Sequence, residues 1–137
     1  PEASLDVRAH AKFKSYSENV GFLTITSNVV TVDLSQAQSF ICTATDTIDS
    51  FTLINIPSDS STFTLKVTQD STGSRSVGID TFKDSGGNTI PVYWPSGVVP
   101  IVTTTADKTD IYTFKTFDGS NITSVGIYGI IGGQNFS

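Results

Sequence analysis

The chain has 137 residues, of which 15% are charged, and its 13 acidic and 8 basic side chains give a formal net charge of −5. This length suits a single domain with one hydrophobic core. The acidic balance and the lack of a Lys/Arg cluster speak against nucleic acid or an anionic membrane surface as partners, since both present negative charge. No apolar run approaches the roughly 20 residues of a membrane-spanning helix, so membrane insertion is not expected.

The residue types favour β structure. Valine (12) and isoleucine (13) outnumber leucine (5), serine and threonine together make up 38 residues, and methionine is absent. Side chains branched at Cβ pack well on a pleated sheet and lose rotamer freedom in a helix. The 11 glycines and 5 prolines provide turns for many short strands. We therefore predict an all-β fold.

The N-terminal segment 5–14, LDVRAHAKFK, alternates strictly between apolar and polar residues. The apolar face carries Leu5, Val7, Ala9, Ala11 and Phe13. Such a period of two is typical of a strand with one buried and one solvated face. Because the polar face is strongly charged, we expect an edge strand or an extended arm. The predicted organisation is an N-terminal strand or arm over 1–16 and a β-sandwich domain over 17–137.

Nine to eleven short strands are expected in all, and no helix. After the N-terminal segment, the expected strands are 21–27, 29–35, 38–45, 49–56, 61–70, 76–82, 101–105, 110–117 and 122–131. The stretch 84–91 is predicted to be a loop, because its two glycines supply backbone angles that other residues resist. Strands at this spacing predict an antiparallel β-sandwich, often of jelly-roll type, with a small barrel as the alternative.

The two residues that most often carry nucleophilic or metal chemistry occur once each. Cys42 is the single cysteine, which rules out an intramolecular disulfide, and it is expected to be a small buried hydrophobe. His10 shares its strand face with Arg8 and Lys12, which disfavour both protonation and metal binding, so it is expected to be solvated. The opening PEASLD is not expected to be a secretory leader, and a start at Pro1 fits either removal of an initiator methionine or a fragment boundary.

Pairs of carboxylates raise the question of catalysis. Asp107 with Asp110, or Asp46 with Asp49, could serve as an acid–base pair. Each of the four lies at a predicted strand boundary or turn, where Asp is favoured because it caps backbone groups. We therefore interpret them as turn residues and expect neither an active site nor a cofactor.

The strand that follows Asp107 carries apolar residues on both faces. Tyr112 and Phe114 lie on one face and Ile111 and Phe117 on the other, which is typical of a central strand covered above and below. The sequence Asp118-Gly119 supplies a tight turn into the next strand. The stretch is thus predicted to be one hairpin of a scaffold.

Three further motifs have both a functional and a structural interpretation. The segment 84–88, DSGGN, resembles a calcium loop but lacks the full run of oxygen ligands, and 121–123 fits the glycosylation sequon, which occurs often by chance. Tyr93 and Trp94 on a loop could form an exposed platform for stacking sugars, or the tryptophan could close one end of the sandwich. We favour burial and keep Tyr93 and Trp94 as the candidate binding site.

The C-terminal half resembles a known family. The motifs are DSTGSRSVG, then YWPSGVVPIVTTTADKTDIYTFKTFDGSN, then GIYGIIGGQNFS, and they cover roughly residues 60–137. Their order and spacing are similar to those of a β-rich domain in structural proteins of tailed bacteriophages, notably those of marine cyanobacteria. The chain departs from that pattern at 78–80, where related sequences often carry a tryptophan.

The resemblance implies a non-enzymatic structural protein on the exterior of a virion. Two placements remain open: an accessory protein that decorates the capsid, or the C-terminal knob of a tail fibre that contacts host surface glycans. A homotrimer is implied by the resemblance alone, with the major capsid protein or tail components as partners. The N-terminal strand is expected to pair with a neighbouring subunit.

Overall fold

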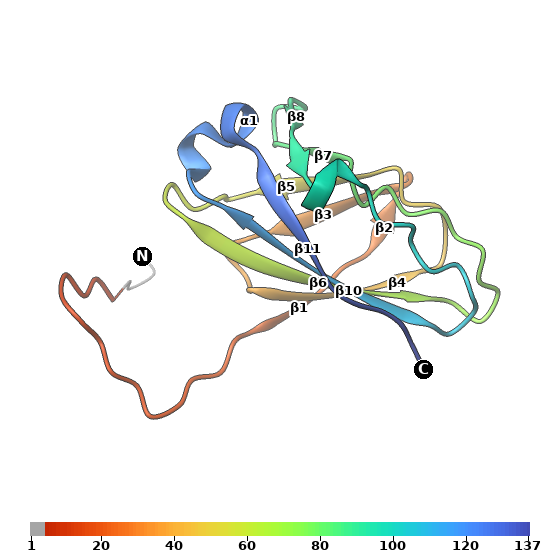
Figure 1. Ribbon diagram of the computed structural model, residues 1–137, viewed down its shortest axis with the longest axis horizontal. Coiled ribbons are helices and arrows are strands. Elements are labelled where there is room, and N and C mark those ends of the chain that lie inside the picture. Colours follow the sequence, from red (N-terminus) through yellow and green to blue (C-terminus); the bar gives the residue numbers. More distant parts are fainter. Residues whose placement is uncertain (1–4) are drawn as a thin grey trace.

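The computed structural model describes residues 5–137 and confirms an all-β sandwich, with two sheets packed face to face (Figure 1). The larger sheet contains, in spatial order, β1 (Val20–Phe22), β4 (Ser39–Ala44), β6 (Ser61–Gln69), β10 (Thr109–Thr116), β11 (Ile127–Phe136) and β9 (Val92–Tyr93). The smaller sheet contains β2 (Ile25–Thr26), β3 (Val29–Asp33), β5 (Ser50–Ile54), β7 (Phe82–Lys83) and β8 (Thr89–Ile90).

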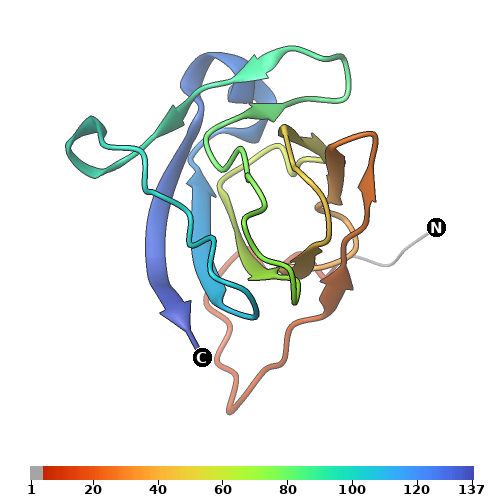
Figure 2. The same ribbon diagram turned by 90° about the vertical axis from the view of Figure 1, so that its right-hand side faces the viewer.

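The predicted antiparallel pairing holds for only part of the sandwich, and several strand pairs are parallel. From β3 to β7 the chain alternates between the two sheets, so that β3 pairs in parallel with β5, β4 with β6, and β5 with β7 (Figure 2). The chain thus winds as a coil in which a strand of the opposite sheet provides each crossover. The alternation of apolar and polar residues along a strand does not reveal this parallel pairing. It shows which face of the strand is buried, but not which strand lies beside it in the sheet.

The pairing on both sides of β10 is antiparallel as predicted. β10 lies between β6 and β11 and pairs with β6 in continuous register from Thr109↔Thr68 to Thr116↔Ser61. It is therefore a central strand. Its inward residues are buried, whereas Phe117, just beyond its end, is 64% exposed, so nothing in the described chain covers the outer face there.

Aromatic side chains fill the space between the sheets. Phe51 stacks on Phe82 with ring centroids 5.2 Å apart, and Phe63 stacks on Phe114 at the same distance. Phe82 and Phe114 join the two pairs at 4.9 Å across the sandwich. Each of these rings is almost fully buried, and burial of one such ring contributes roughly 1.5–3 kcal/mol.

Several predicted elements differ from the structure. The predicted loop 84–91 contains the strand β8, and the predicted strand 21–27 is divided between β1 and β2. Residues 76–82 make one bridge, Ile48↔Val77, and enter a strand only at Phe82, while 101–105 contain no strand. The predicted strand 122–131 begins later, at Ile127. The turn at Asp118 leads first into short helical segments, η2 (Gly119–Asn121) and α1 (Ile122–Val125), and another, η1 (Pro95–Gly97), follows Trp94. These are too short to give a helical period in the sequence.

The N-terminal segment forms an extended arm and not a strand. Every residue from 5 to 19 lies outside regular structure and is exposed, and the arm runs away from the sandwich (Figure 1). Residues 1–4 of the predicted arm lie outside the described residues. In the described part of the chain, no helix is long and apolar enough to cross a membrane.

Candidate interaction site

Three exposed aromatic rings gather at one edge of the larger sheet. Tyr93 of β9 and Tyr128 of β11 are paired in parallel register, and their ring centroids lie 5.3 Å apart. Phe117, which follows β10, meets Tyr128 edge to face at 5.7 Å. We call Tyr93, Tyr128 and Phe117 the aromatic cluster. It exists because β9 and β10 flank β11, so residues far apart in sequence become neighbours.

Trp94 lies beneath this cluster and not within it. Its side chain is 7% exposed and its ring contacts Phe114 edge to face at 5.6 Å, whereas Tyr93 is 45% exposed. Gly129 makes room for the indole, because a Cβ at that position would lie 2.4 Å from the ring. The favoured burial of Trp94 is confirmed. The two-ring platform is not formed, because adjacent residues of an extended chain point to opposite faces.

The aromatic cluster borders a shallow hollow of about 400 Å³ with a mostly apolar lining. The lining residues are Tyr93, Trp94, Pro95, Lys115, Phe117, Tyr128, Gly129 and Ile130. The side chain of Lys115 lies with Nζ 5.2 Å from the centre of the Phe117 ring, and it is the one charged group of the lining. Such a surface suits an apolar or aromatic group, since few polar atoms are available to fix the hydroxyls of a sugar.

The sequence identified Tyr93 as part of this site but missed Tyr128 and Phe117. Phe117 was expected to be covered, and Tyr128 was not singled out. The signal for Tyr128 was available in GIYGII, where the ring alternates with the buried Ile127 and the small Gly129. What the sequence does not reveal is that β9 runs beside this strand.

The arm is the second candidate interaction element. Phe13 is 66% exposed and Tyr16 is 80% exposed, and the other apolar residues of the arm are exposed as well. Within residues 5–16, the one described side-chain contact is the ion pair between Arg8 and Asp6, with Nε and Oδ2 2.9 Å apart. His10, between these charges and Lys12, is exposed as expected. The arm therefore presents an apolar stripe that its own sandwich does not bury.

Asp110 is a buried structural carboxylate, not a turn residue. It accepts hydrogen bonds from the amide of Thr103 (2.8 Å), the amide of Asn135 (2.9 Å), the hydroxyl of Tyr112 (2.8 Å) and Nε2 of Gln134 (3.2 Å). Burial raises the pKa of Asp110, but the hydrogen bonds outweigh this effect and the net pKa is lower than usual. Burial likewise raises the pKa of Tyr112, and its bond to Asp110 adds to the rise. The carboxylate thus joins the loop before β10 to β11.

The other candidate carboxylates serve turns. Asp107 has a positive φ of 59° in the turn before β10, and Asp46 accepts a hydrogen bond from the amide of Thr47 at 2.8 Å. The amide of Asp49 donates to the carbonyl of Asn28, which joins two turns. Among residues 5–137, no group of three His, Cys, Asp or Glu side chains is placed to hold a metal ion.

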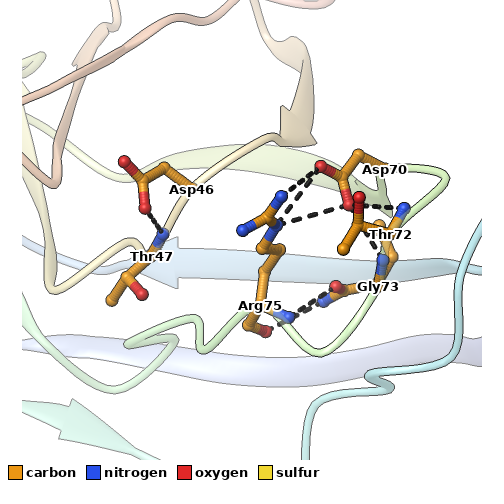
Figure 3. A network of polar contacts seen from close by, with 7 residues as sticks. Asp46, Thr47, Asp70, Thr72, Gly73 and Arg75 are labelled. Atoms are coloured by element: carbon orange, nitrogen blue, oxygen red, sulfur yellow. Dashed lines mark hydrogen bonds and ion pairs between the residues drawn. The ribbon is translucent and has the colours of Figure 1, made fainter.

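The motif DSTGSR forms a locked turn after β6 (Figure 3). Asp70 accepts hydrogen bonds from the amide of Gly73 (2.9 Å) and forms an ion pair with Arg75, whose Nη2 lies 2.8 Å from Oδ2. The bond from Arg75 lowers the pKa of Asp70. Gly73 has a φ of +67°, and a Cβ there would meet the backbone of Ala106 at 2.7 Å. The motif therefore has a structural role in this turn.

The remaining motifs also have structural roles. Asp84 accepts from the amides of Gly86 (2.9 Å) and Asn88 (2.8 Å), which closes the turn between β7 and β8 and occupies the carboxylate expected of a calcium loop. Asn121 of the sequon donates to the side chain of Asp118 at 2.8 Å. Cys42 is buried, and burial raises the pKa of its thiol to about 11, so it is unreactive at neutral pH.

Comparisons with known proteins give no match to the chain among protein families, curated proteins or solved structures. The aromatic cluster and the arm are therefore the two surfaces that bear on function.

Proposed function

We propose that this chain is a non-enzymatic structural protein that joins other subunits through its N-terminal arm. The observation that carries the proposal is the extended arm, which exposes an alternating apolar stripe to solvent. Burying one large apolar side chain of this kind contributes roughly 1.5–3 kcal/mol, so a partner that covers several of them gains considerable affinity. Addition of an extended segment to a partner is a common way for β proteins to associate.

We further propose that the assembly is the exterior of a tailed-bacteriophage virion, with this chain as an accessory or decoration protein. This part rests on the resemblance of the C-terminal motifs to phage structural domains. The locked turn of DSTGSR and the close contact of Gly129 with Trp94 give those motifs physical roles in folding. A homotrimer bound to the major capsid protein is the form that the resemblance favours.

The test is the copy number of this chain relative to the major capsid protein in purified particles. We expect a ratio comparable to that of the capsid subunits. A ratio of a few per cent would replace capsid decoration with a tail position. Absence of the chain from particles would overturn the virion proposal altogether.

A second candidate function is glycan binding by the knob of a tail fibre. The exposed rings of Tyr93 and Tyr128 favour it, because aromatic rings stack against the apolar faces of sugars. Binding of host surface glycans, measured by glycan array and calorimetry, should then be lost in Tyr128→Ala and retained in Tyr128→Phe. Phe22→Ala, at an exposed ring on β1, is the matched control. Equal binding by all four proteins would contradict this candidate.

A further inference from the structure

We propose that the hollow beside the aromatic cluster is the docking site for the arm of a second copy of this chain, with the ring of Phe13 in the hollow. This inference rests on the proposed function, because it takes the arm to be the element of assembly. It identifies the partner and the surface that receives it.

The edge of β11 offers backbone groups next to the hollow. β9 pairs with β11 only at Ile127 and Tyr128, so the stretch 129–136 has no strand partner in the described chain on the side away from β10. An unpaired strand edge is a template for a further strand. A segment placed there would lie directly beside the aromatic cluster.

The lining of the hollow selects an aromatic side chain over a sugar. Its charged group, the Lys115 ammonium, sits over the Phe117 ring, and the other side chains of the lining are apolar except for two tyrosine hydroxyls and the buried indole N–H of Trp94. A third ring would make stacked or edge-to-face contacts with Tyr128 and Phe117, which are already spaced 5.7 Å apart.

The arm has the complementary features. It is extended and unpaired, its apolar residues alternate, and Phe13 is 66% exposed. The nine residues 5–13 match the eight residues 129–136 of the free edge in length. With Phe13 in the hollow near Ile130, the arm runs antiparallel to β11 and Leu5 reaches the region of Phe136, another exposed apolar side chain.

The charges of the two partners are opposite in sign. Residues 5–16 carry three cationic side chains against one carboxylate, whereas residues 17–137 carry five cationic side chains against eleven carboxylates. The arm is therefore attracted to the body of another copy over a range of about 10 Å at moderate salt.

A second copy satisfies the geometry better than the same chain does. The arm leaves the sandwich at β1, and β4, β6 and β10 separate that edge from β11. Crossing four strand spacings takes about 19 Å, and the link from Val20 to Phe13 spans at most about 25 Å when fully extended. Docking within one chain would therefore use about three quarters of the full reach of the link and hold it almost straight across the sheet, while a neighbouring copy has no such limit.

The experiment places the photo-crosslinking residue p-benzoyl-phenylalanine at position 13 of the full-length chain, where it keeps an aromatic anchor. We expect irradiation to give covalent oligomers, and mass spectrometry to find the crosslink in peptides that contain Tyr93–Pro95 or Tyr128–Ile130. The matched control carries the same residue at position 22, since Phe22 is also highly exposed but lies on β1. It should give no crosslink to those peptides.

Substitutions measure the same contact in solution. Phe13→Ala and Tyr128→Ala should each weaken self-association about tenfold or more, as expected for an anchor and its pocket. The double variant should lose little more than either single variant, because both remove one shared contact. Phe13→Ala leaves the sandwich untouched, so its effect does not depend on folding. Tyr128→Phe, which retains the ring, should associate like the parent.

Four results would overturn the inference in distinguishable ways. Crosslinks from position 13 to another surface, in an oligomer that forms only with the arm, would support assembly through the arm but show that the docking site lies elsewhere. A crosslink to the hollow within a single chain would exclude a second copy. A glycan bound in the hollow of the intact oligomer would show that the arm does not occupy it. If the protein is monomeric at all concentrations, both the docking site and self-assembly through the arm are contradicted.

Discussion

At the scale of single residues, the carboxylates of the stretch 105–118 illustrate how similar side chains acquire different roles. Asp110 is 1% exposed and accepts four hydrogen bonds, while Asp107 lies three residues away in an exposed turn. A buried carboxylate persists only when its lone pairs are satisfied, because an unpaired buried charge costs several kcal/mol. The network around Asp110 meets that requirement.

Replacing Asp110 with alanine should destabilise the fold by about 2–4 kcal/mol, because the amides of Thr103 and Asn135 would lose their buried acceptor. The measurement is the free energy of unfolding in urea. Asp107→Gly is the control, and it should change little, since glycine adopts the positive φ of that turn without strain. An equal loss in both variants would contradict the distinction drawn between them.

The same carboxylate should make stability depend on acid pH. The pKa of Asp110 is lower in the folded state than in the unfolded chain, so its contribution is fully present above the unfolded value of about 4 and is lost as the pH falls through the folded value. The unfolding free energy, measured from pH 6 to pH 2, should therefore fall less steeply below pH 4 in Asp110→Asn than in the parent. Identical slopes would mean that Asp110 titrates normally.

At the scale of elements, the long strands of the core could be predicted and their neighbours could not. The ends of β6 and β10 lie within one residue of the ends of the predicted strands 61–70 and 110–117. Alternation and flanking turns identify such strands from local sequence. The parallel coil of β3 to β7 depends on contacts across the sandwich, which local patterns do not encode. The short β9 escaped prediction for the same reason, and with it the aromatic cluster.

β11 depends on a glycine for its contact with the core. A Cβ at residue 129 would meet the Trp94 ring, so Gly129→Ala should destabilise the protein by about 1–3 kcal/mol and shift the emission of its single tryptophan. Thermal unfolding followed by fluorescence measures both effects. Gly86→Ala is the control, because a Cβ there comes no closer than 3.1 Å to its neighbours, the side chains of Asn88 and Asp84 in an exposed turn. If Gly129→Ala unfolds like the parent, the indole has room that the structure does not show.

At the scale of the whole molecule, the chain consists of a self-contained sandwich and an arm that the sandwich does not bury. The sequence predicted that the strand 110–117, which is β10, is covered on both faces. Phe117, just beyond β10, and Tyr128, Ile130 and Phe136 of β11 remain exposed within one chain, although their side chains are largely apolar. Such a surface is typical of proteins that complete their burial on association.

Deleting residues 1–16 should therefore separate assembly from folding. The unfolding free energy of the truncated sandwich, measured at a concentration where the parent is dissociated, should equal that of the parent, because the described arm makes no contact with the sandwich core. The mass in solution, measured by light scattering, should fall to that of a monomer. The parent should also dissociate more readily at high salt, since the cationic arm meets an acidic body. If the truncated protein kept the parent mass, association would depend on the sandwich alone, and the arm would be free for another partner.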